Sequence, residues 1–219
     1  MVNGQQNIRG KNPYRVTYNV YEENAGMNSK APEYHEQVYQ PETDTYLLLS
    51  SVKNEIRNGD TVLEVGTGSG VIAQACSERA RCVATDVNPH ACRMAHEMGV
   101  EAVRTDLYAG LNGPFDLIVF NPPYLPTAEN ERIDDWLEYA LDGGPDGRAV
   151  IRRFASGLQR ILQPYGRVLL LVSSLTGIQE TRELFAEQGF LSCIVGEETT
   201  EGERLVVFRI THDLCSLRD

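Results

Sequence analysis

Residues 121–124 read Asn-Pro-Pro-Tyr and follow directly on an apolar run. The nitrogen of an amide or an aromatic amine is a poor nucleophile because its lone pair is delocalised into the adjoining π system. A site that accepts both N–H bonds, on the Asn121 side-chain oxygen and the Pro122 carbonyl, holds such a nitrogen in line with an electrophile. Pro123 would stiffen the turn, and Tyr124 offers an aromatic face to a flat group. We therefore predict Asn121, Pro122 and Tyr124 as catalytic residues and the whole tetrapeptide as the substrate contact.

A glycine-rich run at residues 64–70, Glu-Val-Gly-Thr-Gly-Ser-Gly, follows a β-rich segment and precedes a helical one. Glycines at the carboxyl end of a strand let a nucleotide approach the backbone closely. Asp86 and Asp106 come after the next two predicted strands, and an acid about 20 residues beyond such a loop can accept hydrogen bonds from a ribose. A dinucleotide fingerprint would need glycine where Val71 stands, and no phosphate-binding Gly-Lys-Ser/Thr sequence follows. The run therefore indicates a nucleotide other than NAD.

The elements that position these motifs alternate between strand and helix. We expect strands at 61–65, 82–85, 101–104, 115–120, 167–173, 190–195 and 204–211, and helices at 41–57, 71–78, 89–98, 148–162 and 178–188. This alternation predicts an α/β fold, with a seven-stranded, mostly parallel sheet and helices on both faces. The last connection is too short for a crossover helix, so the final two strands should form an antiparallel hairpin.

Taken alone, the tetrapeptide is better explained as a polar loop that leaves a buried strand tightly. In the predicted fold, however, the glycine run, both acids and Asn121 all follow strands of one sheet and share its carboxyl edge, where ligands of open α/β sheets bind. Their convergence favours the functional interpretation.

Length and composition limit the classes of protein that fit. With 219 residues, 42% hydrophobic and 23% charged, the chain fits one domain, which we place at 39–219 after a flexible arm at 1–38. No apolar run reaches the roughly 20 residues of a membrane span, and the N-terminus lacks a secretory signal, so we expect a cytoplasmic protein. The formal charge of −11 argues against direct binding to nucleic acid, whose affinity comes largely from Lys and Arg. A protein substrate or partner is favoured instead.

The residue types that bind metals show no ligand spacing, so we expect no metal site. The cysteines are scattered, without a C-x-x-C pair, and are read as reduced core thiols: Cys76, Cys82, Cys92, Cys193 and Cys215. The histidines are equally scattered and are read as packed or solvated: His35, His90, His96 and His212. Arg152 and Arg153 are expected on the exposed face of their helix, and Trp136 in ordinary packing.

Four stretches together resemble one protein family. Residues 64–70 are similar to the E/D-x-G-x-G-x-G loop of class I S-adenosylmethionine-dependent methyltransferases, and residues 121–124 match the (D/N)-P-P-(Y/F/W) signature of enzymes that methylate planar NH2 groups. Residues 38–48, Val-Tyr-Gln-Pro-Glu-Thr-Asp-Thr-Tyr-Leu-Leu, resemble the V-Y-x-P-x-x-D-T-x-L-L stretch of the HemK/PrmC family, in its short archaeal and eukaryotic branch. Residues 141–147, Leu-Asp-Gly-Gly-Pro-Asp-Gly, resemble the G-G-x-D-G loop of that family.

The resemblance implies a Rossmann-like methyltransferase fold with S-adenosylmethionine as the cofactor. It also implies methyl transfer to glutamine N5 in the Gly-Gly-Gln motif of a class-1 translation release factor. By match to the family's motifs, the residues implied to contact cofactor or substrate are Thr45, Glu64, Gly66, Gly68, Gly70, Asp86, Asp106, Leu107 and Asn121. Thr45 is equally explained as a capping or packing residue of its helix.

The resemblance extends to a partner, because short members of the family act with a small zinc-ribbon activator protein. The family's strand order places the strand at 101–104 at a sheet edge, and an unpaired edge can accept a strand from another chain. We therefore expect the activator at this edge, near residues 100–104, over apolar groups around Val100 and Val103. The segment upstream of Val38 departs from the family's pattern.

Two alternatives stay open from the sequence. Asn-Pro-Pro-Tyr by itself permits glutamine, adenine N6, cytosine N4 or guanine N2 as the methylated group, so a DNA or RNA amino-methyltransferase is the first alternative. The acidic charge and the absence of a target-recognition insert weigh against it. A non-catalytic scaffold that keeps the fold is the second, and the intact glycines, the two acids and Asn121 weigh against that one.

Overall fold

A computed structural model describes residues 34–128, 135–200 and 202–213 of the chain. The strands are β1 (Thr61–Val65), β2 (Arg81–Asp86), β3 (Glu101–Arg104), β4 (Phe115–Phe120), β5 (Leu162–Ser173), β6 (Phe190–Thr200) and β7 (Glu203–His212). The helices are α1 (Thr43–Glu55), α2 (Val71–Ser77), α3 (Pro89–Glu97), α4 (Trp136–Tyr139), α5 (Ala149–Ile161) and α6 (Ile178–Glu187). The predicted alternation of strand and helix is confirmed.

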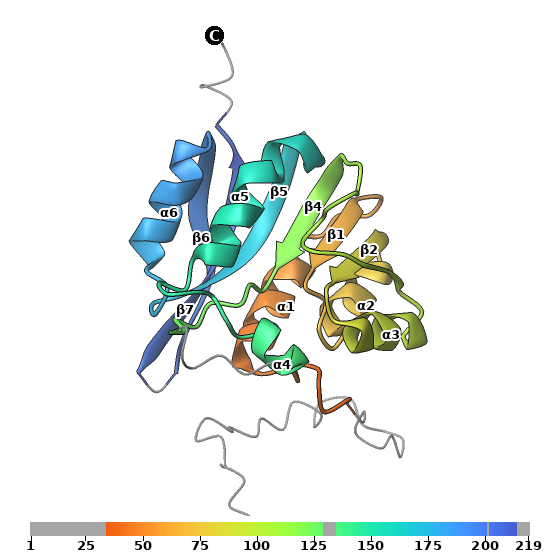
Figure 1. Cartoon of the computed structure of the whole chain (residues 1–219). Helices are drawn as coiled ribbons and strands as arrows, with labels where there is room; N and C mark the ends of the chain where they lie inside the picture. Colours follow the sequence, from red (N-terminus) through yellow and green to blue (C-terminus); the bar gives the residue numbers. More distant parts are fainter. Residues whose placement is uncertain (1–33, 129–134, 201, 214–219) are drawn as a thin grey trace, which may run out of the picture. The chain divides into compact units, whose positions relative to one another are not determined.

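The strands form one seven-stranded sheet in the order β3-β2-β1-β4-β5-β7-β6. Every neighbouring pair from β3 to β5 is parallel, whereas β7 runs antiparallel to both β5 and β6. This is the predicted mostly parallel sheet with a C-terminal antiparallel hairpin, and β3 lies at an edge as expected. In Figure 1, β1, β2 and β4 point the same way, so the loops that follow them share one rim of the sheet.

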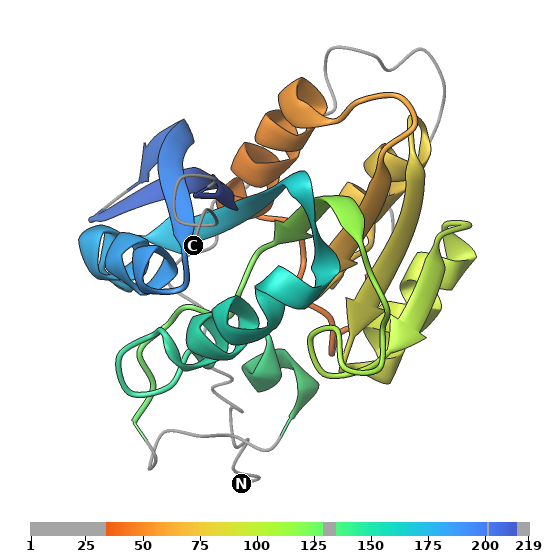
Figure 2. The ribbon, with the colours of Figure 1, turned by 90° about the horizontal axis from the view of Figure 1, so that it is seen from above.

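Helices cover both faces of the sheet, as predicted. In Figure 2, α1 (orange) lies on one side of the sheet and α5 (teal) and α6 (blue) lie on the other. The core on the α1 side includes Leu48, Ile72 and Leu117, and the core on the α5 side includes Phe154 and Phe185. Because side chains alternate along a strand, β4 is buried on both faces. It is therefore a firm support for the tetrapeptide that follows it.

The C-terminal hairpin is longer than the sequence predicted. β6 continues past Val195 through a bulge to Thr200, and β7 already begins at Glu203. This extension consists mainly of Glu and Thr, a composition that resembles a loop although its residues pair with β7. β5 also begins earlier than expected, at Leu162. The four-residue helix α4 was not predicted, because so short a segment shows no helical period.

Several other sequence predictions meet the structure here. Cys76, Cys82 and Cys92 are buried, but Cys193 is exposed on the edge strand β6, so the core prediction was wrong for it; Cys215 lies outside the described residues. The domain boundary at residue 38 stays a prediction, since residues 1–33 are not described. Within the described ranges, no helix is long and apolar enough to cross a membrane, and no group of three or more His, Cys, Asp or Glu is placed to hold a metal.

Arg167 of β5 is a fully buried cation near the amino ends of β1 and β4, at the opposite end of these strands from the rim. Only 1% of its surface is exposed. Its guanidinium contacts the Asp60 carboxylate at 2.6 Å and donates to the carbonyls of Asp116, at 3.0 Å, and of Glu55. These partners belong to the starts of β1 and β4 and to the end of α1. A buried charge persists only when it is paired and hydrogen-bonded, so Arg167 fastens α1 to the sheet.

We expect Arg167→Met to lower the free energy of unfolding by about 3–5 kcal/mol, because the buried Asp60 carboxylate would lose its cationic partner. Arg209→Met is the matched control, since Arg209 contacts Glu55 nearby but is 32% exposed. Its loss should cost at most about 1 kcal/mol. Urea unfolding followed by circular dichroism measures both values. Equal losses in the two variants would contradict the role given to Arg167.

Candidate active site

The glycine run forms the turn between β1 and α2 at the rim. Gly66 and Gly68 have positive φ angles of 66° and 50°, which strain a residue that carries a side chain. A Cβ on Gly66 would lie 3.5 Å from the Phe120 ring and 4.0 Å from the Asn121 carbonyl oxygen, and one on Gly68 would lie 3.8 Å from the Tyr39 carbonyl oxygen. The turn therefore runs between the segment before α1 and the start of the Asn-Pro-Pro-Tyr tetrapeptide. Three motifs that are far apart in the sequence meet here.

Asp86 ends β2 beside this turn. Its carboxylate accepts hydrogen bonds from the backbone N–H groups of Gly68 and Asn88, each at 2.9 Å. Burial raises the pKa of Asp86, and these hydrogen bonds oppose the shift. The Asn88 side chain also donates to the Gln37 carbonyl at 2.7 Å, which ties the segment before α1 to the rim. Asp86 thus stands where an acceptor for ribose hydroxyls was predicted.

Two other members of the run are engaged inside the protein. Glu64 is buried, accepts a hydrogen bond from the Thr67 hydroxyl, and has a pKa that burial raises well above its usual value. Gly70 is the N-cap of α2, where a Cβ would lie 3.0 Å from the Met98 sulfur. Both residues shape the turn from within. Their contact with a cofactor stays a prediction.

The loop after β3 carries Asp106 and Leu107, the third predicted contribution to the rim. Leu107 is the one described non-glycine residue with a positive φ, at 52°, a conformation that persists only when the surroundings enforce it. The Asp106 carboxylate is paired with Arg153 of α5, and both side chains are about half exposed. Arg153 lies on the exposed face of its helix, as expected, and there it also holds this acid. The turn at Leu107 and the ion pair place the Asp106 carboxylate at the rim, facing α5.

Asn121 is oriented by a residue that the sequence analysis did not single out. Its side-chain Nδ2 donates to the Asp44 carboxylate at 3.0 Å. A carboxylate accepts hydrogen bonds and donates none, so the NH2 end of the Asn121 amide must face Asp44 and Oδ1 must point elsewhere. Oδ1 is buried, and no described residue donates to it. A buried acceptor without a donor costs about 1–3 kcal/mol, so Oδ1 is left with the capacity to accept an N–H group.

Asp44 is itself held from several sides. It is buried, with Oδ1 accepting from the Thr45 backbone N–H at 2.6 Å and from the Thr45 hydroxyl at 3.2 Å. Oδ2 accepts from the Tyr39 hydroxyl at 3.1 Å as well as from Asn121. Thr45 therefore keeps Asp44 in place. The sequence had left two interpretations of Thr45 equal, contact with the cofactor and a capping or packing role in its helix. Its predicted cofactor contact is not tested by this arrangement.

Tyr39 and Tyr124 flank the Asp44–Asn121 pair. Burial raises the pKa of both phenols, and the neighbouring carboxylate of Asp44 raises them further. Both side chains are therefore neutral, and Tyr39 acts as a donor to Asp44. Pro122 is buried at the same turn. The arrangement offers an oriented amide oxygen next to an aromatic side chain, which suits a flat NH2 group.

Trp136 lies closer to the rim than ordinary packing suggested. Its backbone N–H donates to the Gln37 side chain at 3.2 Å, and the Arg104 guanidinium lies 5.5 Å from the centre of its ring. Arg104 in turn donates to the carbonyl of Val87, the residue after Asp86. These contacts join residues from four distant segments, so no local spacing could have indicated them.

For Asp44, the one signal in the sequence was its place as the acid of the V-Y-x-P-x-x-D-T stretch.

Comparison with known proteins places this rim in a family. The methyltransferase small domain, a family profile, matches residues 39–136. A Methanocaldococcus jannaschii protein named as a candidate protein N5-glutamine methyltransferase is 42% identical over 164 residues, which are 71% of this chain and 82% of that protein. The chain belongs to the HemK/PrmC family of methyltransferases.

Other members of the HemK/PrmC family agree with this assignment. Human methyltransferase HEMK2 is 33% identical over 184 residues, which cover 74% of this chain and 86% of HEMK2. Among solved structures, a chain of the E. cuniculi Mtq2–Trm112 complex, responsible for methylation of the eRF1 translation termination factor, matches with a TM-score of 0.68 at 29% identity. The match covers 80% of this chain and 99% of that one.

For this HemK/PrmC-family protein, we expect affinity for S-adenosylmethionine to fall on acidification. The fall should begin at a higher pH than the usual pKa of an aspartate would give. Burial raises the pKa of Asp86, so its carboxyl is protonated at a higher pH than usual and would then serve poorly as the predicted acceptor for ribose hydroxyls; above that pKa the charged acceptor is present. Calorimetric titration across acid and neutral pH measures the effect. Asp86→Asn should bind weakly at every pH and lose this dependence. An unchanged pH dependence in that variant would assign the effect to another group.

Proposed function

We propose that the chain transfers the methyl group of S-adenosylmethionine to N5 of the glutamine in the Gly-Gly-Gln motif of a class-1 translation release factor, in the cytoplasm. The fixed orientation of Asn121 carries the proposal: Asp44 holds Nδ2, and the buried Oδ1 has no donor among the described residues. The choice of a glutamine is supported by the relatives, one named as a candidate protein N5-glutamine methyltransferase and one from a complex responsible for the methylation of eRF1.

The described residues fit S-adenosylmethionine. The glycine turn leaves room for close approach, because Gly66 and Gly68 present backbone where side chains would stand. Asp86 offers a carboxylate at the end of β2, and Asp106 offers another in the loop after β3. When bound, the cofactor supplies an electrophilic methyl group on a sulfonium.

The contribution of the chain to the reaction is to position a weak nucleophile. Asn121 Oδ1 and the Pro122 carbonyl accept the two N–H bonds of the substrate amide, which fixes the direction of its nitrogen. Formation of the N–C bond would break the bond between the methyl group and the cofactor sulfur, which keeps the electron pair. The substrate nitrogen would gain positive charge, and these two acceptors would stabilise it until one proton leaves to solvent. Asp44 prevents the Asn121 amide from turning over, so the acceptor is in place before the substrate arrives. Tyr124 packs against the flat amide.

An activator on the β3 edge is part of the same proposal. β3 is an edge strand, and its Ala102 and Val103 are only partly buried. Val100 is 3% exposed and belongs to the core below α3, so the apolar groups open to an activator are those of its neighbours on β3. The E. cuniculi relative is found in a complex with Trm112, which supports a small protein as the partner. We propose a small zinc-ribbon protein that adds to this edge.

We expect Asp44→Asn to lower kcat by about 10- to 100-fold, at least as much as Asp44→Ala, with cofactor affinity near that of the wild type. The oxygen of the introduced side-chain amide would still accept the Thr45 N–H, so its NH2 group would face Asn121. The Asn121 Oδ1 would then accept a hydrogen bond from this NH2 group and would no longer be available to the substrate. Glu42→Gln is the matched control, because Glu42 also contacts Tyr39 but not Asn121. A near-normal kcat for Asp44→Asn would refute the orienting role.

The function is tested with labelled S-adenosylmethionine offered to a release factor, to the same factor with its Gly-Gly-Gln glutamine replaced, and to DNA and RNA. Label should enter only the intact factor. Asn121→Ala should reduce transfer by about 100-fold or more while cofactor affinity stays close to normal. Label in nucleic acid but not in the factor would overturn the proposal.

The same reactions, run with and without a zinc-ribbon activator protein, test the partner. Faster transfer or better solubility on co-expression is expected. A fully active, soluble single chain would count against the activator and leave the glutamine proposal standing.

A further inference from the structure

The loop at residues 141–147, Leu-Asp-Gly-Gly-Pro-Asp-Gly, has no role in the function proposed above, yet it packs against the active tetrapeptide. The residues that follow Tyr124 exchange three backbone hydrogen bonds with this loop: Leu125 N to Leu141 O at 3.1 Å, Gly143 N to Leu125 O at 2.9 Å, and Thr127 N to Gly144 O at 3.0 Å. The exit from the tetrapeptide is therefore fixed as firmly as a short piece of sheet.

The backbone of Tyr124 is enclosed from two sides. A Cβ on Gly147, which has a φ of 71°, would lie 2.5 Å from the Tyr124 carbonyl oxygen, and a Cβ on Gly143 would lie 2.9 Å from the carbonyl carbon. Neither position leaves room for a side chain. From the other side Thr176, which is fully buried, donates its hydroxyl to the same carbonyl at 3.4 Å. Thr176 belongs to the loop between β5 and α6, so two separate loops hold this one carbonyl.

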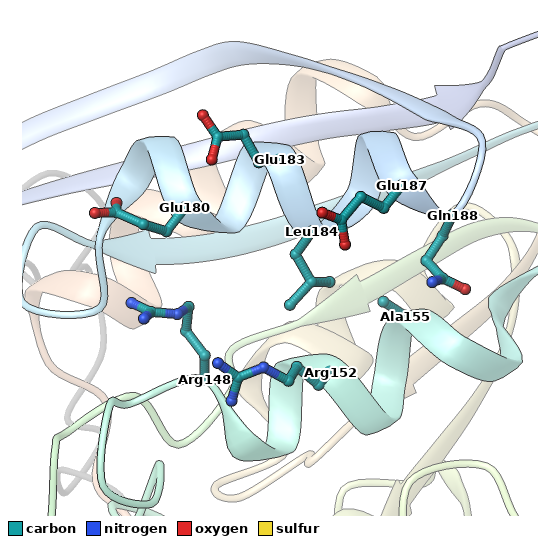
Figure 3. Close-up of a pocket in the computed structure, with 8 residues that line it drawn as sticks. All are labelled: Arg148, Arg152, Ala155, Glu180, Glu183, Leu184, Glu187 and Gln188. Carbon is teal, nitrogen blue, oxygen red and sulfur yellow. The ribbon is translucent and has the colours of Figure 1, made fainter.

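Arg148, the N-cap residue of α5, joins these two loops. Its guanidinium donates to the Thr176 carbonyl and pairs with the Asp146 carboxylate at 3.1 Å. Asp146 lies in the 141–147 loop, and its carboxylate also accepts the Arg148 backbone N–H at 3.0 Å. One side chain thus sets the separation of the two loops that enclose Tyr124. Figure 3 shows Arg148 reaching from α5 into the pocket between α5 and α6.

Arg152 provides an internal comparison. It lies one turn further along α5, lines the same pocket in Figure 3, and also pairs with Asp146. Its hydrogen bond lowers the pKa of Asp146 to about 2, so that carboxylate is charged throughout the working pH range. The described contacts of Arg152 do not include Thr176. The two arginines therefore share charge, pocket and carboxylate partner. They differ in the link to the second loop and in exposure, with 20% of the Arg148 side chain exposed and 51% of that of Arg152.

We propose that Arg148 is a positioning residue for methyl transfer. It holds together the two loops that fix the Tyr124 backbone. The position of that backbone in turn sets where the Pro122 carbonyl and the Tyr124 ring meet the substrate NH2 group. The inference rests on the function proposed above. A misplacement of about 1 Å at a reacting centre can cost on the order of 100-fold in rate. A Cβ on Gly66 or Gly68 would lie nearest to Phe120, Asn121 and Tyr39 rather than to either of these loops, so we expect Arg148 to have little effect on cofactor affinity.

The test compares Arg148→Met with Arg152→Met in the full chain. Arg148→Met should lower kcat for the release factor by about 10- to 100-fold, with the dissociation constant of S-adenosylmethionine unchanged, whereas Arg152→Met should keep kcat near that of the wild type. Arg148→Lys should recover part of the loss, because an ammonium can reach one of the two loops but lacks the fork that spans both. A loss of stability alone would not produce this split between kcat and cofactor affinity.

Amide hydrogen exchange of Leu125 and Thr127, whose N–H groups donate to the 141–147 loop, reports on the loops without any substrate. Exchange there should accelerate in Arg148→Met and stay slow in Arg152→Met. If the wild type transfers no methyl to a glutamine, the proposed function fails, and the exchange comparison still decides whether Arg148 locks the loops. Equal exchange in the two variants, or an equal fall in kcat, would overturn the positioning role.

Discussion

The hydrogen bond from the Asn121 amide to the Asp44 carboxylate is the constraint on which the site depends. The two ends of a side-chain amide have almost the same shape, so only a neighbour that accepts and cannot donate forces one orientation. Asp44 is that neighbour, placed by the first turn of α1 against the end of β4. Its carboxylate is in turn held by Thr45 and Tyr39. The chemistry assigned to Asn121 therefore depends on how the start of α1 docks on the sheet.

The sheet makes this docking possible, and it divides the support of the site between its two faces. Parallel strands deliver the glycine turn, Asp86 and Asn121 to one rim, and β4 is immobilised by cores on both sides. From the α1 face, Asp44 orients the side chain that accepts the substrate. On the α5 side, the 141–147 loop and Thr176 hold the backbone of the same tetrapeptide. Side-chain and main-chain acceptors are thus positioned by separate elements.

The parts predictable from the sequence were those governed by local pattern. Apolar runs gave the strands, and a turn motif that follows a strand must lie on the carboxyl rim, so Asn121, Asp86 and the glycine run could be placed without coordinates. The bond between Asp44 and Asn121 joins residues 77 positions apart, and neither residue carries a local sign of the other. The Glu- and Thr-rich extension of β6 and the exposure of Cys193 were misjudged because edge strands can be polar or exposed at positions where a central strand cannot.

The central claim is that Asn121 presents its oxygen, and not its NH2 group, to the substrate nitrogen. Neutron diffraction from a deuterium-exchanged crystal of the protein with S-adenosylhomocysteine and a Gly-Gly-Gln peptide would observe this directly, because deuterium distinguishes the two ends of an amide that X-rays leave nearly equivalent. The account predicts both Asn121 deuterons at Nδ2, one of them directed at Asp44, and a glutamine N–D directed at Asn121 Oδ1. An Asn121 deuteron directed at the substrate, with Oδ1 turned toward Asp44, would contradict it.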